Sequence, residues 1–208
     1  REFVSLTSAS SARNGAGFMP CQGLYYQPKG RRPKTAFIAT HYNVDFSEHY
    51  PAAYMARRGY GYLGWNTRFR GNEAFFTLEH ALVDIGAGVT WLREQAGVET
   101  VVIVGNSGGG SLMGAYQSQA SVLSITPTRG QTLPDAIFAL PACDYYISLN
   151  AHQGRPEVLT SWMDPAITDE RDPVSVDSTL DMFNADNGPP YSEAFIRRYR
   201  VGQTARNH

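Results

Sequence analysis

The stretch ETVVIVGNSGGGSLMGAYQSQA, residues 99–120, limits the possible folds of this chain more than any other segment. Its apolar, β-branched start is typical of a buried strand, and its end has the composition of a helix. Between them lies the pattern G-x-S-x-G, formed by Gly105, Ser107 and Gly109. A serine in such a turn adopts a strained backbone, and small residues two positions away let strand and helix approach closely. The pattern therefore predicts a sharp bend that raises the Ser107 hydroxyl above the carboxyl end of a sheet.

Strand and helix patterns alternate along most of the chain. Parallel strands need long crossover connections, which helices supply, so this alternation predicts a doubly wound, mostly parallel α/β sheet. The first two expected strands are joined by SASSARNGAG, turn material that predicts an N-terminal hairpin. The expected strands cover residues 3–6, 24–27, 35–40, 60–65, 100–104 and 136–140, and the expected helices cover 51–58, 78–96 and 111–119.

The composition changes after residue 144. We expect residues 1–144 to form the N-terminal part of the α/β core, and residues 145–208, rich in Asp, Pro and Ser at first, to form a lid-like excursion. A helix begins again near Ser192, a residue suited to an N-cap. A sheet that stops at a sixth strand has an open edge, which proteins normally cover. The sequence thus predicts a chain truncated after its sixth strand and lid segment.

Composition and charge exclude several function classes. The 208 residues carry a net charge of -1, so no strong field attracts nucleic acid or an anionic membrane surface. The apolar runs are too short to span a bilayer. The two cysteines, Cys21 and Cys143, cannot form a disulfide framework, which favours a cytoplasmic location. We expect a small-molecule partner, with no nucleic acid and no membrane; a homo-oligomer remains open.

The segment from residue 35 to residue 144 resembles the α/β-hydrolase superfamily, in particular its serine esterases and lipases. The resemblance rests on the Ser107 turn, on the order of strands and helices, and on two loops. In that family a loop beginning with His follows an earlier strand and donates a backbone N–H to the oxyanion; here FIATHYN places His41, Tyr42 and Asn43 there, with Tyr in place of the usual Gly. An arginine–glycine turn follows the next strand in the family, and NTRFRGN supplies Arg70 and Gly71.

This resemblance implies acyl transfer without a metal or an organic cofactor. Ser107 attacks the carbonyl of a small-molecule carboxylic ester, and a histidine accepts its proton. The N–H of Gly108, with that of Tyr42 or Asn43, binds the developing oxyanion. We expect a further set of side chains near the carboxyl ends of the strands to line the substrate pocket: His41, Trp65, Tyr145 and Tyr146.

The acid and the histidine of the expected triad are the incomplete part of this interpretation. The family order is serine, acid, histidine, with the last two on loops after later strands. Asp144, expected at the carboxyl end of the sixth strand, is a candidate acid. His152 has the right order but follows by only eight residues, so no catalytic histidine is identified in this chain. We expect the histidine on missing residues, or on a second chain or C-terminal fragment that completes the fold.

Three other interpretations compete with this one. A chain of this fold without a working histidine is a ligand receptor or a scaffold subunit. The glycines between Gly105 and Gly110 also resemble a nucleotide-binding turn, although the middle glycine of the fingerprint is replaced. Asp45, Glu48 and His49 are metal-ligand residue types, but their spacing matches no known metal site, so a solvated loop is the favoured interpretation.

Overall fold

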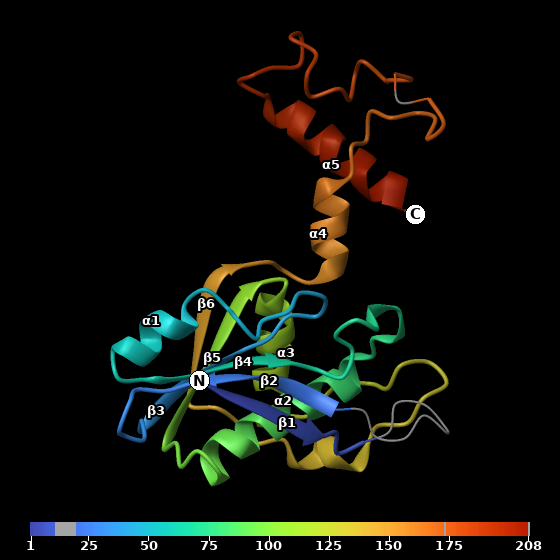
Figure 1. Cartoon of the computed structure of the whole chain (residues 1–208). Helices are drawn as coiled ribbons and strands as arrows, with labels where there is room; N and C mark the ends of the chain where they lie inside the picture. The colour runs from blue at the N-terminus through green and yellow to red at the C-terminus, as the bar shows by residue number, and fades with distance from the viewer. Residues whose placement is uncertain (11–19, 173, 208) are drawn as a thin grey trace. The chain divides into compact units, whose positions relative to one another are not determined.

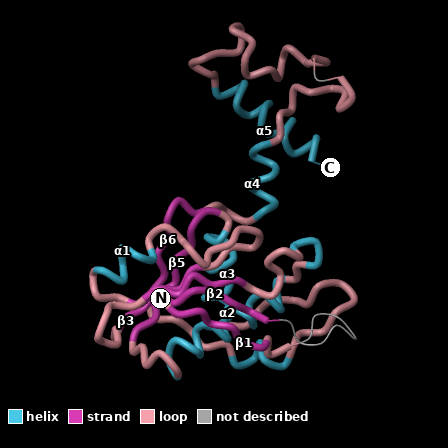
Figure 2. The backbone as a smooth tube through the Cα atoms, viewed as in Figure 1, coloured by secondary structure: helices cyan, strands magenta, loops and turns pink. Residues whose placement is uncertain are grey.

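The structure, a computed structural model, describes residues 1–10, 20–172 and 174–207. It consists of two compact units, Arg1–Gln153 and Gly154–His208. The first unit holds a six-stranded sheet in the spatial order β1-β2-β4-β3-β5-β6, drawn in magenta in Figure 2. The strands are β1 (Glu2–Thr7), β2 (Pro20–Tyr26), β3 (Thr35–Ala39), β4 (Gly61–Asn66), β5 (Thr100–Ser107) and β6 (Tyr145–Ala151).

The sheet combines an antiparallel edge with a parallel centre. β1 pairs with β2 and β2 with β4 in antiparallel register, whereas β4, β3, β5 and β6 are parallel neighbours. The predicted doubly wound, mostly parallel α/β sheet is confirmed. The turn expected between β1 and β2 falls largely on residues 11–19, outside the described residues, but the antiparallel pairing of these strands is the predicted hairpin.

Helices cover both faces of the sheet (Figure 1). α1 (Ala52–Arg57) packs on one face, while α2 (Leu78–Glu94) and α3 (Gly109–Ser121) pack on the other. Alternate residues of β5 belong to two separate cores: Val101 and Ile103 to the core of α2 and α3, Val102 and Val104 to the core of α1. This double burial explains why β5 is a continuous apolar run rather than an alternating one.

Helices α1 and α2 end close to the glycines that were predicted to stop them, and α1 starts at the predicted proline. Pro51 caps α1, where its missing N–H is not needed. Gly59 and Gly97 follow the two helices with φ values of +99° and +70°, a region that favours glycine.

The predicted sixth strand at residues 136–140 is wrong. The chain forms a short 3-10 helix there, η2 (Asp135–Ala139), between Pro134 and Pro141, and a similar turn, η1 (Glu73–Phe75), precedes α2. A short apolar run does not by itself distinguish a strand from a turn, and the flanking prolines favour the turn. The sixth strand lies later, at β6, within the compact unit Arg1–Gln153.

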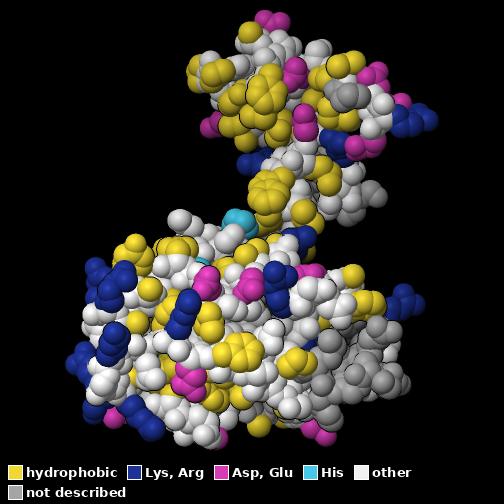
Figure 3. Space-filling model, in the orientation of Figure 1, with side chains coloured by type: hydrophobic (Ala, Val, Ile, Leu, Met, Phe, Trp, Pro, Cys, Tyr) yellow, Lys and Arg dark blue, Asp and Glu magenta, His cyan; other side chains and the backbone are white. Residues whose placement is uncertain are grey.

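The second unit contains α4 (Arg155–Trp162) and α5 (Glu193–Asn207). Gln203 of α5 donates two hydrogen bonds of 2.9 Å, to the carbonyls of Ser161 and Met163, and thereby holds the two helices together. Ser192 caps α5 as predicted, since its Oγ accepts the N–H of Phe195 at 3.1 Å. Figure 3 shows many hydrophobic side chains on the surface of this unit. Among the helices of the described residues, none is long and apolar enough to cross a bilayer.

Candidate active site

Ser107 lies in the sharp turn between β5 and α3. It is the last residue of β5, and α3 begins two residues later, at Gly109. Ser107 has φ +53°, and in the part of the chain that the structure describes Asn150 is the only other non-glycine residue with a positive φ. Such a backbone costs on the order of 1–3 kcal/mol and persists only where its surroundings impose it. The predicted strained turn is therefore present, and Ser107 is half-buried rather than covered.

The surroundings that impose this turn are backbone contacts made through glycines. A Cβ on Gly105 would lie 2.9 Å from the Cα of Gly110, so strand and helix approach as closely as predicted. A Cβ on Gly109 would collide with the carbonyl oxygen of Thr40, and one on Gly110 with the Cβ of Ala151. The cluster thus packs the start of α3 against the ends of the neighbouring strands, which any larger side chain would prevent.

A bulge in β6 supports the turn from the other side. Asn106 pairs with Leu149, but Ser107 pairs with Ala151, so Asn150 is an extra residue in β6 and has φ +44°. Beyond the bulge, the N–H of His152 donates to the carbonyl of Ser107 at 2.8 Å. This bulge was not predicted from the sequence. Its local signal is the asparagine, a residue type that tolerates positive φ.

The loop after β3 lies against the other side of the turn. A Cβ on Gly108 would collide with the ring of Tyr42 and would lie 2.7 Å from His41 Nε2. The two rings stack with their centroids 4.5 Å apart, and the N–H of Asn43 donates to His41 Nδ1 at 3.2 Å. The structure therefore brings together the residues predicted to form an oxyanion hole. Of the two candidates for the second donor, Asn43 has its N–H bonded to His41 within the loop.

Asp144 lies at the wrong end of the sheet for the predicted catalytic acid. It precedes β6, and its carboxylate accepts the N–H of Val101 at 2.8 Å and contacts Arg93 at 3.1 Å. Val101 and Ser107 are six residues apart on β5, or about 20 Å at the rise of an extended strand. The prediction was wrong because it placed the sixth strand before Asp144 instead of after it. This carboxylate instead ties β6 to α2 and β5.

The aromatic residues expected to line a substrate pocket have other positions. Trp65 is fully buried in the core, where its Nε1 donates to the carbonyl of Asp84 at 2.8 Å. Tyr145 begins β6, at the same end as Asp144, and its side chain is exposed. Tyr146 reaches under the turn, and its hydroxyl donates to the carbonyl of Gly110 at 2.9 Å. Trp65 and Tyr145 therefore do not line the site, whereas Tyr146 supports it.

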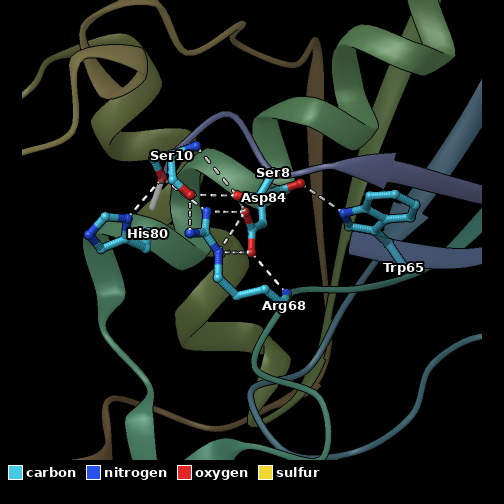
Figure 4. Close-up of polar contacts among 6 residues, drawn as sticks. All are labelled: Ser8, Ser10, Trp65, Arg68, His80 and Asp84. Carbon is cyan, nitrogen blue, oxygen red and sulfur yellow. Dashed lines mark hydrogen bonds and ion pairs between the residues drawn. The ribbon is translucent and has the colours of Figure 1, made fainter. Parts of the chain in front are cut away.

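A second polar cluster of the first unit lies between the end of β1, the loop after β4 and α2 (Figure 4). Arg68 and Asp84 form an ion pair of 2.5 Å, and their side chains are only 1% and 0% exposed. Ser8 donates to Asp84 at 2.8 Å, and Ser10 is joined both to Arg68 and to the ring of His80. Arg68 therefore anchors the end of β1 to α2. His80, on α2, is buried as well.

The residue types that suggested a metal site form other bonds. Asp45 accepts hydrogen bonds of 2.8 Å from the N–H of Ser47 and the side-chain amide of Asn66. Its pKa is lowered by these hydrogen bonds, which outweigh the opposing effect of partial burial. Glu48 pairs with Arg1, and His49 is buried and hydrogen-bonded to Tyr62 and Asn106. Within the described residues no group of three or more His, Cys, Asp or Glu side chains is arranged to hold a metal ion.

Comparisons with known proteins gave matches among solved structures only. No family model matches the chain, and no curated protein does. The chain is similar to brefeldin A esterase, a bacterial homologue of human hormone-sensitive lipase, with 19% identity over 58% of this chain and a TM-score of 0.43. It is also similar to a lidless α/β serine hydrolase from Xanthomonas campestris, with 22% identity over 77% of this chain and a TM-score of 0.38. The chain spans 35% of the length of the first protein and 79% of the second.

Proposed function

We propose that this chain carries the nucleophile and the oxyanion hole of a serine hydrolase that cleaves carboxylic esters. Ser107 attacks the carbonyl carbon, the carbonyl oxygen becomes an oxyanion, and loss of the alcohol leaves an acyl-enzyme that water hydrolyses. The observation that carries the proposal is the left-handed backbone of Ser107 between a buried strand and a helix. A serine is held in such a strained position where its exposure is useful.

The position of the Tyr42 loop supports the proposed oxyanion hole. Gly108 begins the turn into α3 and lies directly against the rings of His41 and Tyr42. We assign the N–H groups of Gly108 and Tyr42 as the two donors. The N-terminus of the 13-residue helix α3 adds a partial positive charge on the same side of Ser107, which favours an anion forming there.

The packing of the glycines argues against phosphate binding. In a phosphate-binding turn, glycines let the backbone approach the ligand. Here Gly109 and Gly110 let the backbone approach Thr40 and Ala151 of the same chain. The absence of their side chains is thus explained by protein contacts.

His152 is a candidate for the histidine that accepts the proton of Ser107, because its backbone N–H donates to the carbonyl of Ser107. The ring of His80 bonds to Ser10 in the second cluster, and both ring nitrogens of His49 contact other side chains. Replacing His152 by alanine tests it as proton acceptor. If the variant loses activity as fully as Ser107→Ala, His152 is the base; if activity persists, His152 is excluded as the base.

The proposal is tested by labelling the full chain with a fluorophosphonate probe and by hydrolysis of p-nitrophenyl esters. We expect labelling that Ser107→Ala abolishes, with hydrolysis reduced by about 1,000-fold or more. Ser121→Ala is the control, because Ser121 is an exposed serine at the end of the same helix. An unlabelled but folded chain would contradict the proposal and favour the ligand-receptor or scaffold interpretation. Stabilisation by nucleotides would favour the nucleotide-binding one.

A further inference from the structure

His49 is a buried histidine close to the Ser107 turn that the proposed mechanism does not use. It lies in the loop between β3 and α1 and is 7% exposed. Its Nδ1 is 2.5 Å from the hydroxyl of Tyr62 on β4, and its Nε2 is 3.1 Å from Oδ1 of Asn106 on β5. The ring is also stacked on Phe46, with centroids 4.2 Å apart, so its orientation is restricted. His49 therefore links Tyr62, near the start of β4, to Asn106, near the carboxyl end of β5.

The hydrogen bonds determine which nitrogen of His49 carries the proton. Nδ2 of Asn106 donates to the carbonyl of Leu149 at 2.7 Å, which leaves Oδ1 to accept from His49. Nε2 must then carry the hydrogen, and in a neutral imidazole Nδ1 accepts from the hydroxyl of Tyr62. Burial lowers the pKa of His49 and so favours this neutral form. A directed series of bonds runs from β4 through His49 and Asn106 to β6.

This series ends beside the nucleophile. Asn106 immediately precedes Ser107, and Leu149 immediately precedes Asn150, the extra residue of the β6 bulge. The Asn106 side chain therefore joins the last regular pair of β5 and β6 before both backbones turn left-handed. Any rotation of this side chain would loosen the point where the strained turn begins.

We propose that His49 is a positioning residue that holds the Ser107 turn in its reactive geometry through the Asn106 side chain. The inference rests on the proposed serine hydrolase function. His49 does not touch the reacting atoms. Its Nε2–H holds Oδ1 of Asn106, and Asn106 holds β5 and β6 in the register that exposes Ser107.

Two substitutions distinguish the role of the Nε2 contact with Asn106 from that of the Nδ1 contact with Tyr62. In His49→Gln, the side-chain amide reaches the place of Nε2 and keeps a donor for Asn106. In His49→Asn, the shorter amide reaches only the place of Nδ1 and keeps the contact with Tyr62. We expect His49→Asn to lower kcat for a p-nitrophenyl ester and the labelling rate by about tenfold or more, because small misplacements of a reacting group have such effects. KM should change little, and His49→Gln should recover most of the rate.

The control is His80→Asn, which removes a buried histidine from α2 in the second cluster. It should lower Tm as His49→Asn does, while labelling per folded molecule stays at the wild-type rate. Equal losses of kcat in His49→Asn and His80→Asn would overturn the inference, as would a His49→Gln variant as slow as His49→Asn.

Nuclear magnetic resonance provides a readout that does not depend on hydrolysis. We expect the nitrogen shifts of wild-type His49 to report the Nε2–H tautomer, and the Gly108 amide shift to change in His49→Asn but not in His49→Gln. A protein that shows these shifts but is not labelled by the probe would contradict the proposed function and leave the His49 link supported. An unchanged Gly108 shift in His49→Asn would overturn the link itself.

Discussion

The Arg68–Asp84 cluster and the Ser107 turn both place polar groups among apolar side chains. They differ in whether those groups have hydrogen-bond partners and an unstrained backbone. In the first, a buried carboxylate receives hydrogen bonds from a guanidinium, a backbone N–H and a serine. In the second, the backbone of Ser107 is strained, and Ser107 is only half-buried. A buried cluster with every group bonded fixes the positions of chain segments. A strained, accessible serine is the arrangement expected of a reactive group.

The largest expected effect on stability comes from breaking the satisfied cluster. Asp84→Ala leaves the Arg68 guanidinium buried without its counter-charge, and we expect the free energy of unfolding to fall by about 3–5 kcal/mol. Urea denaturation measures this change. The control is Glu73→Ala, which removes the partly exposed partner of Arg70 and should have a much smaller effect, about 1 kcal/mol or less. Similar losses in the two variants would contradict the comparison.

The next largest effect is expected at the turn itself. In Gly108→Ala, the new Cβ collides with the rings of Tyr42 and His41, so the proposed oxyanion donors must separate. We expect the labelling rate of Ser107 to fall by about 10²–10³, the usual cost of one lost donor. Gly114→Ala is the matched control on the same helix, because its Cβ would lie 3.8 Å from the Tyr146 hydroxyl, an ordinary contact. A fast Gly108→Ala enzyme would contradict the assignment.

A smaller effect is expected from pH. Burial and the neighbouring Arg68 lower the pKa of His80, so the unfolded chain binds a proton more readily than the folded one as pH falls below about 6.5. Stability contributed by the neutral ring is complete above that pH and is lost below it, by at most about 1.4 kcal/mol per pH unit. The free energy of unfolding, measured by urea denaturation between pH 5 and 7, should therefore depend less steeply on pH in His80→Asn than in the wild type. An unchanged slope would contradict this source of the pH dependence.

The smallest effect is expected at Asp144. Its carboxylate lies at the opposite end of β5 from Ser107 and forms a half-exposed ion pair with Arg93. Asp144→Ala should leave the labelling rate unchanged and lower the free energy of unfolding by about 1 kcal/mol or less. Loss of labelling in a folded variant would restore Asp144 as the acid.

Most of the sheet could be predicted from the sequence because its strands and helices are marked by local patterns. These patterns are the continuous apolar runs of β3 and β5 and the glycines that follow α1 and α2. The sixth strand could not be predicted in this way. It is an edge strand, YYISLNA, whose large side chains Tyr145, Tyr146 and Ile147 are exposed, so it lacks the pattern of a buried strand. The apolar run at 136–140, which resembles a buried strand, forms a turn instead.

The candidate site divides in the same manner. Ser107 and Gly108 were found because a strand, a G-x-S-x-G pattern and a helix follow one another directly. Asn150 and His49 were missed because their roles depend on residues distant in the sequence: the bulge at Asn150 forms against β5, and His49 bonds to Asn106, 57 positions away. No local pattern records such pairings.

The sequence by itself determined the α/β alternation and the serine turn, because both depend on residues close together along the chain. Only the tertiary structure decided what surrounds Ser107: the Tyr42 loop against Gly108, the bulge at Asn150, and the placement of Asp144 at the far end of its strand. The physical reason is that parallel strands bring together residues far apart in sequence, so a shift in the position of one strand moves its side chains from one end of the sheet to the other.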